Sequence, residues 1–212
     1  MAAPRPDRVA ALAQYRRRAA FYDLELALLE PVRREAIARL ALVPGETVVD
    51  VGCGTGLSFE GLRAGVGARG RIVGIEQSPE MIAKARERVA RHRWKNVTLV
   101  CAPVESAALT TRADAALFHF THDILRRRDA VEHIVGHLKP GARIVASGLQ
   151  WARGRARLAN LLVLPAALHS VTSLEGLGAP WSRLAKVVGP LELETLLLGA
   201  VYIARGRVAG GD

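Results

Sequence analysis

An acid and three alternate glycines form the first group of residues whose types and spacing suit chemistry. Asp50 lies within the short apolar run of residues 48–51, and Gly52, Gly54 and Gly56 follow it. The β-branched run predicts a strand buried on both faces, and the glycines predict a tight turn where a ligand approaches bare backbone. A pyrophosphate binds such a turn through backbone N–H groups and a helix N-terminus, with no carboxylate beside it. An acid two positions before the first glycine therefore favours a nucleoside that carries positive charge.

A second acid follows at the distance that a βαβ unit sets. Residues 71–76 are typical of a strand, and its last residue, Glu76, falls 20 residues after Gly56, close to the roughly 20 expected for a ribose-binding acid. A carboxylate at this place can accept hydrogen bonds from both ribose hydroxyls. Ser78 and Pro79 then predict a helix start, with serine as the cap and proline in the first turn. S-adenosylmethionine (SAM) carries an ammonium and a sulfonium and no phosphate, so it suits a turn flanked by two acids.

Three segments resemble motifs of the class I SAM-dependent methyltransferases. The D-x-G-x-G-x-G turn at 50–56 is similar to their first motif, and G-I-E-Q-S-P-E-M-I at 74–82 is similar to their second. L-K-P-G-A at 138–142 also resembles the family's sequence before its fifth strand. The resemblance implies an α/β fold with a doubly wound, Rossmann-like sheet of seven strands in the order 3-2-1-4-5-7-6, the last strand antiparallel. It also implies SAM as the cofactor and S-adenosylhomocysteine (SAH) as the product.

The same resemblance assigns the residues that bind the cofactor. Gln77, just past the second acid, would lie near the adenine, and Ala102 stands where the family usually has an acid that binds the adenine amino group. Because Pro103 follows and offers neither an N–H nor a carboxylate, adenine recognition falls to backbone groups near Cys101 and Ala102 or to Glu105. The predicted cofactor-binding residues are Asp50, Gly52, Cys53, Gly54, Gly56, Glu76, Gln77, Ala102 and Phe118.

Two histidines follow the predicted fourth strand, residues 113–118. That strand end lies where ligands bind in doubly wound sheets. His119 and His122 are therefore candidates for contact with the methyl acceptor or for proton removal, with an ordinary pKa near 6.5. Both are open to a structural interpretation as hydrogen-bonded groups, and Asp123 is a candidate cap for the next helix. Tyr22 is the third catalytic candidate, because many relatives that modify small molecules or lipids cover the cofactor with an aromatic-Tyr-Asp segment; a tyrosine packed at a helix start is the alternative.

The remaining polar residues predict neither a metal site nor a disulfide. His133 and His137 have metal-ligand spacing, but no acid lies between them and no third ligand is evident, so a solvated helix face is favoured. Cys53 and Cys101 do not make a disulfide framework, which favours a reducing cytoplasm. The net charge of +10 favours an anionic partner, yet aromatic residues are only 5% of the chain. Nucleic acid is disfavoured because base stacking lacks its usual platform.

The length of the chain predicts one α/β domain, with an N-terminal helical lid at 1–43 and a SAM-binding domain at 44–212. No stretch reaches the length of a membrane span. Residues from about 149 to 189 are predicted to form a cap insertion, because an apolar stretch with a basic flank either covers the substrate cleft or rests on an anionic membrane. The cap is favoured and would select a hydrophobic acceptor. Residues 191–198 and 200–206 predict two last strands, which the short turn at Gly199 makes antiparallel.

These features together predict a methyltransferase that acts on an N, O or C nucleophile of a small-molecule or lipid-like acceptor. In-line displacement at the methyl carbon needs mainly alignment and exclusion of water, because a sulfonium is a good leaving group. The Tyr-Asp lead-in, Pro180-Trp181 and the L-G-x-x-Y-I-A-x-G tail look most like the bacterial group that acts on phosphatidylethanolamine and quinones. Two alternatives stay open: transfer of the 3-amino-3-carboxypropyl group of SAM, and a non-catalytic basic binding module on the same fold.

Overall fold

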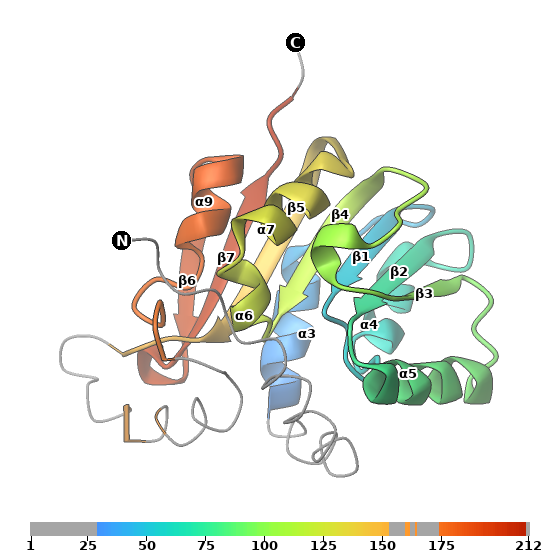
Figure 1. Ribbon diagram of the computed structural model, residues 1–212, viewed down its shortest axis with the longest axis horizontal. Helices are drawn as coiled ribbons and strands as arrows, with labels where there is room; N and C mark the ends of the chain where they lie inside the picture. Colours follow the sequence, from blue (N-terminus) through green and yellow to red (C-terminus); the bar gives the residue numbers. More distant parts are fainter. Residues whose placement is uncertain (1–28, 153–159, 162–163, 165–173, 211–212) are drawn as a thin grey trace.

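The computed structural model describes residues 29–152, 160–161, 164 and 174–210. Within them, seven strands form one mixed sheet in the order β3-β2-β1-β4-β5-β7-β6 (Figure 1). Neighbouring strands from β1 to β5 are parallel, whereas β7 is antiparallel to both β5 and β6. The predicted strand order and antiparallel end are confirmed. The strands are β1 (Thr47–Val51), β2 (Arg71–Glu76), β3 (Val97–Cys101), β4 (Ala113–His119), β5 (Leu138–Leu149), β6 (Glu192–Leu196) and β7 (Val201–Arg207).

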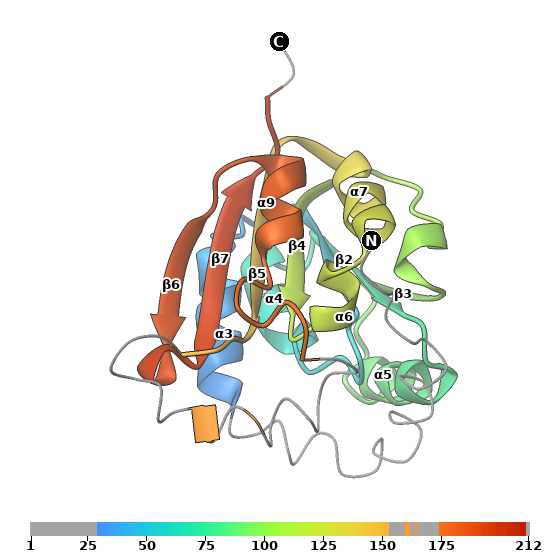
Figure 2. The same ribbon diagram turned by 60° about the vertical axis from the view of Figure 1, so that its left-hand side comes forward.

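Helices cover both faces of the sheet, and each layer buries its own apolar cluster. Figure 2 shows α7 and α9 in front of the strands and α3 behind them. Both faces of β1 are therefore covered, which explains why its run of valines is buried throughout. One layer contains α3 (Glu30–Arg39), α4 (Phe59–Val66) and α5 (Pro79–Arg91), and the other contains η2 (Val104–Ser106), α6 (His122–Leu125), α7 (Arg128–Gly136) and α9 (Ser182–Val188).

The register of the parallel strands brings the predicted site residues to one edge. Val51 in β1 pairs with Ile75 in β2 and with Phe118 in β4. Glu76 and His119, each one residue further along, therefore end their strands beside the glycine turn. α5 begins at the same edge, where the Ser78 hydroxyl accepts a hydrogen bond of 3.3 Å from the Met81 N–H, as expected of a serine cap.

The last two strands form the predicted antiparallel hairpin, although their connection is longer than expected. A 3-10 turn, η4 (Leu197–Gly199), joins β6 to β7. Leu197 and Leu198 have left-handed backbone φ angles of 49° and 56°, and both side chains are exposed. Gly199 alone does not make this turn.

Strand β6 is the outer strand of the sheet on this side. Two of its acidic side chains are paired with arginines of neighbouring elements. Glu192 forms an ion pair with Arg205 in β7, and Glu194 accepts a hydrogen bond of 2.7 Å from Arg39 at the end of α3. The outermost strand is therefore tied both to its neighbour in the sheet and to the helix layer.

Two predicted element boundaries are wrong. Asp123 does not cap a single long helix, because it is the second residue of α6, Thr121 is the N-cap, and Arg127 is extended (φ −101°, ψ 111°) between α6 and α7. Strand β5 begins at Leu138, so the L-K-P-G-A sequence at 138–142, expected before the fifth strand, is part of the strand. The Gly141 N–H donates to the Val208 carbonyl at 3.1 Å, and this pairing beyond the end of β7 extends the strand.

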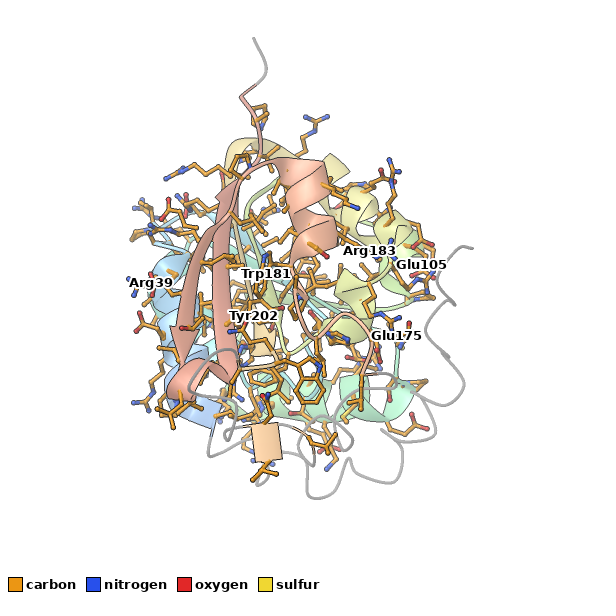
Figure 3. All side chains as sticks on the ribbon, turned by 90° about the vertical axis from the view of Figure 1, so that its left-hand side faces the viewer. Arg39, Glu105, Glu175, Trp181, Arg183 and Tyr202 are labelled. Carbon is orange, nitrogen blue, oxygen red and sulfur yellow. The ribbon has the colours of Figure 1, made fainter. Side chains whose placement is uncertain are left out.

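Most of the predicted lid and cap lies outside the described residues, and so does Tyr22. The described end of the predicted cap insertion, α9, packs on the sheet beside α7 through Leu184. Trp181, just before this helix, lies against Tyr202 of β7 with ring centroids 4.9 Å apart (Figure 3). Among the helices that the structure describes, none combines the length and apolar character needed to cross a bilayer.

Candidate functional site

The glycine corner after β1 is built on left-handed backbone. Gly52, Gly54 and Gly56 have φ angles of 69°, 55° and 79°, a region that side chains with a Cβ rarely adopt. At Gly52 a Cβ would also lie 2.7 Å from the Thr121 Cγ2 and 2.8 Å from the Ile124 Cδ1. The corner therefore needs glycine both for its turn and for its close approach to the start of α6.

Glu76 at the end of β2 is connected directly to this corner. Its carboxylate accepts hydrogen bonds from the N–H of Gly54 at 3.1 Å and from the N–H of Ser78 at 2.8 Å. Burial raises its pKa, while these backbone hydrogen bonds oppose the rise. A carboxylate has about four acceptor sites, and the backbone groups of Gly54, Ser78 and Gln77 do not fill them all, so Glu76 both orders the corner and can accept a ligand hydroxyl.

Asp50 is the second buried acid of the site, with 2% of its surface exposed. Burial raises its pKa to about 7; Arg33 opposes this rise, and Glu76 adds to it. Within the part of the chain that the structure describes, its Oδ2 has no hydrogen-bond partner. A buried acceptor without a partner is costly, which makes Asp50 a natural partner for a cationic ligand group.

Asp50 and the glycine corner line one pocket that opens at the sheet edge. The space inside it, including its open mouth, is about 380 Å³. Its walls come from α3, the corner and the end of β4. The predicted residues Asp50, Gly52, Cys53, Gly54 and His119 meet here, whereas Gly56 and Glu76 are not among the lining residues. The lining residues are Arg33, Asp50, Gly52, Cys53, Gly54, Thr55, Leu57, Ser58, His119 and Phe120.

Arg33 is a charged pocket residue that the sequence prediction missed. It lies on α3 and is 3% exposed. Its Nη1 donates to Glu30, but its Nε and Nη2 have no partner among the described residues. The available signal was its helical spacing, because Ala36 and Leu40, three and seven residues later, are fully buried.

His119 at the end of β4 is half-buried and hydrogen-bonded. Its Nδ1 lies 2.8 Å from the Ser147 hydroxyl oxygen on β5. Burial, followed by the nearby Arg33 charge, lowers its pKa to about 3. The expectation of an ordinary pKa is therefore wrong for His119, and its imidazole is neutral at pH 7. Next to it, Phe120 has a left-handed φ of 56° and donates its N–H to the Ser147 carbonyl at 2.8 Å.

His122 lies on α6 and is not among the residues that line this pocket. Its Nε2 is 2.9 Å from the Glu175 carbonyl oxygen, and Arg126 on the same helix forms an ion pair of 2.6 Å with the Glu175 carboxylate. Figure 3 shows Glu175 beside this helix. His122 therefore helps to attach the segment at Glu175 to α6, and its predicted catalytic role stays a prediction.

Three further residues predicted to contact the cofactor are buried or already bonded within the protein. Phe118 is fully buried in the apolar cluster, and Phe120 lines the pocket instead. The Ala102 N–H donates to the Glu76 carbonyl at 3.1 Å, so this donor is already in use. Glu105, the alternative adenine contact, forms an ion pair with Arg127 at 2.8 Å.

Cys53, Gln77 and the second histidine pair complete the predicted set. The Cys53 thiol is buried, and burial raises its pKa well above the ordinary value. Gln77 lies between Glu76 and the cap of α5. His133 is not simply solvated, because its Nε2 lies 2.9 Å from the Ala107 carbonyl oxygen, and the Nδ1 of His137 lies 2.8 Å from the His133 carbonyl. In the described ranges no three His, Cys, Asp or Glu side chains are grouped as metal ligands.

Comparison with known proteins relates the segment that contains this corner to a known family. Residues 48–141 match the family model described as a methyltransferase domain. This segment is therefore similar to a methyltransferase domain. SAM is the cofactor of this class of domain, and the sheet has its Rossmann-like strand order. The comparison does not single out the group acting on phosphatidylethanolamine and quinones, so that finer placement stays a prediction.

Relatives of the chain are named for different acceptors. An arsenite methyltransferase of Halobacterium salinarum is 46% identical over 57 residues, which are 27% of this chain and 15% of the relative. The aklanonic acid methyltransferase DauC of a Streptomyces species is 30% identical over 93 residues, 43% of this chain and 42% of the relative. The chain thus spans less than half the length of these relatives.

A solved structure extends the similarity of fold to most of the chain. The N-methyltransferase NodS of Bradyrhizobium japonicum, in complex with SAH, superimposes with a TM-score of 0.69 at 17% identity, covering 93% of this chain and 98% of NodS. At that identity the match concerns the fold. It agrees with the seven-stranded order described above.

Proposed function

We propose that the protein is a SAM-dependent methyltransferase that acts on a small-molecule or lipid-like acceptor. One observation carries the proposal: two buried acids at neighbouring strand ends flank the glycine corner, and Glu76 binds the corner itself through the Gly54 N–H at 3.1 Å. A pyrophosphate would be repelled by Asp50 in the pocket, whereas a cationic nucleoside is attracted.

The residues present fit SAM. Asp50, with its unpartnered Oδ2, is suited to bind the methionyl ammonium, and Glu76 is suited to accept the ribose hydroxyls. The left-handed glycines allow the backbone to approach the nucleoside closely. SAM supplies a methyl group on a sulfonium, which is already a good leaving group.

The residues of the chain then provide alignment and exclusion of water. Phe120 lines the pocket as an apolar surface, and the neutral imidazole of His119 offers a hydrogen bond instead of a positive charge. A low pKa makes His119 a weak base, so the acceptor would arrive with its nucleophilic lone pair available. Positioning of this kind can supply several kcal/mol of the barrier. Tyr22, against the methionyl part of the cofactor, remains part of the proposal.

Relatives named for small-molecule methylation support a small or lipid-like acceptor. The proposed cap between 149 and 189 and a peripheral contact with an anionic membrane would both favour an apolar acceptor. Aminocarboxypropyl transfer remains the alternative chemistry. Mass spectrometry of the released nucleoside distinguishes the two, because methyl transfer releases SAH and the alternative releases methylthioadenosine.

Binding of SAH to Glu76 variants tests the cofactor assignment. Calorimetry should give an affinity at least about 100-fold lower for Glu76→Ala than for the wild type, because two charge-assisted hydrogen bonds to ribose are lost. Glu87→Gln, an exposed acid on α5, is the matched control and should bind like the wild type. An unchanged affinity in Glu76→Ala, or no SAH binding by the wild type, would refute the assignment.

A further inference from the structure

We propose that Arg33 binds the carboxylate of the methionyl group of SAM, so that Arg33 and Asp50 together recognise both charges of the amino acid end. The inference rests on the proposed function and deepens it, because it assigns a subsite to a residue that carries no motif. It also makes α3, which precedes the glycine corner in the chain, part of the cofactor site.

The hydrogen bonding of Arg33 is incomplete for a buried guanidinium. Only 3% of the residue is exposed, and one nitrogen, Nη1, donates to Glu30. Nε and Nη2 have no partner among the described residues. These two nitrogens lie on one edge of the planar guanidinium, which is the edge that binds a carboxylate in bidentate fashion. A buried charge with unused donors is costly, and a carboxylate ligand would satisfy both.

The position of Arg33 matches the second half of a zwitterion. It lines the same pocket as Asp50 and the glycine corner. Its charge lowers the pKa of both Asp50 and His119, which line the same pocket. An α-amino acid carries its ammonium and carboxylate on one carbon, and the pocket offers one unpartnered acceptor and two unpartnered donors.

A purely structural role explains Arg33 less well. Glu30 already pairs with Arg34, whose Nε is 3.2 Å from the Glu30 Oε1 and whose side chain is 79% exposed. Arg34 thus forms an ion pair with Glu30 while its side chain stays in solvent, and it avoids the cost of burial. Arg33 instead occupies a core-facing position next to fully buried Ala36 on α3.

A carboxylate could reach Arg33 from two sources, the methionyl group or the acceptor. Two nucleosides separate them: SAH, and decarboxylated SAH (S-adenosyl-3-thiopropylamine), which keeps the ammonium and lacks the carboxylate. Calorimetry on the full chain should show that the wild type binds SAH about 10- to 100-fold more tightly than the decarboxylated compound. In Arg33→Gln the ratio of the two affinities should fall toward one. In Arg33→Lys it should fall to an intermediate value.

Arg34→Gln is the matched control, because it changes the neighbouring arginine and the same ion pair but leaves the pocket intact; it should keep the wild-type ratio. Thermal melts without ligand check that each variant is folded.

Equal loss of affinity for both nucleosides in the folded Arg33 variants would indicate a structural role and overturn the proposal. An unchanged ratio would also overturn it and would leave the acceptor carboxylate as the partner. If the Arg33 variants do not fold, the wild type decides the question. Affinities of the wild type for SAH and decarboxylated SAH that are nearly equal would overturn the proposal. Failure of the wild type to bind either nucleoside would instead refute the proposed function.

Discussion

The two sides of the pocket differ in how their polar groups are satisfied. On the cofactor side, Asp50 and Arg33 are buried with atoms that have no partner among the described residues. On the side formed by the end of β4, His119 is hydrogen-bonded to Ser147 at 2.8 Å, and Phe120 donates its N–H to the Ser147 carbonyl at 2.8 Å. The first side carries unpaired buried groups of both signs, which a charged ligand would satisfy. On the second side, His119 and Phe120 are each hydrogen-bonded to Ser147, and this side would act mainly through shape.

The largest effect that would test this difference is expected at Gly52, where the two sides touch. Gly52→Ala should lower the free energy of unfolding by about 3 kcal/mol, because the added Cβ meets Thr121 and Ile124 and the backbone is left-handed. Urea denaturation measures the loss. Gly141→Ala is the control, since Gly141 has a similar φ of 75° and nothing within 4 Å of its Cβ; it should cost only the backbone term, about 1–2 kcal/mol. Equal losses would contradict the close approach.

An intermediate effect is expected from the charge of Asp50. Its pKa in the folded protein is about 7, above its ordinary value of 3.8, so the folded state retains a proton that the unfolded state releases. Its contribution to stability is therefore greatest below pH 4 and is lost as pH rises to about 7. Asp50→Asn should remove that decline, making the variant more stable than the wild type at pH 8 in urea denaturation without ligand.

Folding favours the protonated form of Asp50, whereas ligand binding should favour the ionised form. The wild-type affinity for SAH should fall by up to about tenfold per pH unit below pH 7, because the ammonium binds the carboxylate form. Asp50→Asn should bind weakly at every pH. Calorimetry from pH 5.5 to 8.5 measures both, and an Asn variant that binds like the wild type would show that Asp50 does not carry the ammonium.

The smallest effect is expected at His119, on the side whose hydrogen bonds are already made. Because its pKa is lowered to about 3, its ring proton resonances should not shift between pH 5 and 8 in NMR spectra. Ser147→Ala should lower stability by about 1 kcal/mol through the lost hydrogen bond and leave SAH affinity unchanged. If the His119 resonances instead shifted with a midpoint near pH 6.5, His119 would again be a candidate base.

Features set by neighbouring residues were predictable from the sequence. The valine run, the alternate glycines and the acid at the end of β2 placed the corner correctly, because strand and turn preferences act within a few residues. The short connection before β7 was enough to predict its direction. The full strand order came from resemblance to a family.

Features that depend on packing between distant segments were not predictable. Arg33 meets the pocket only because α3 lies against β4 and β5. The low pKa of His119 follows from its burial and from the nearby Arg33 charge. Among the backbone groups near Cys101 and Ala102 that were predicted to recognise adenine, the Ala102 N–H donates to the Glu76 carbonyl of β2 instead. The gap between α6 and α7 at Arg127 also had no clear local signal.

The pairing of Glu192 and Glu194 on β6 has a consequence for behaviour in concentrated solution. An outer strand exposes unpaired backbone groups that can recruit a strand from another molecule. Here acids held by Arg205 and Arg39 occupy that strand, and an incoming chain would have to displace or desolvate these ion pairs. These ion pairs therefore disfavour the addition of further strands at β6 and the formation of fibrils.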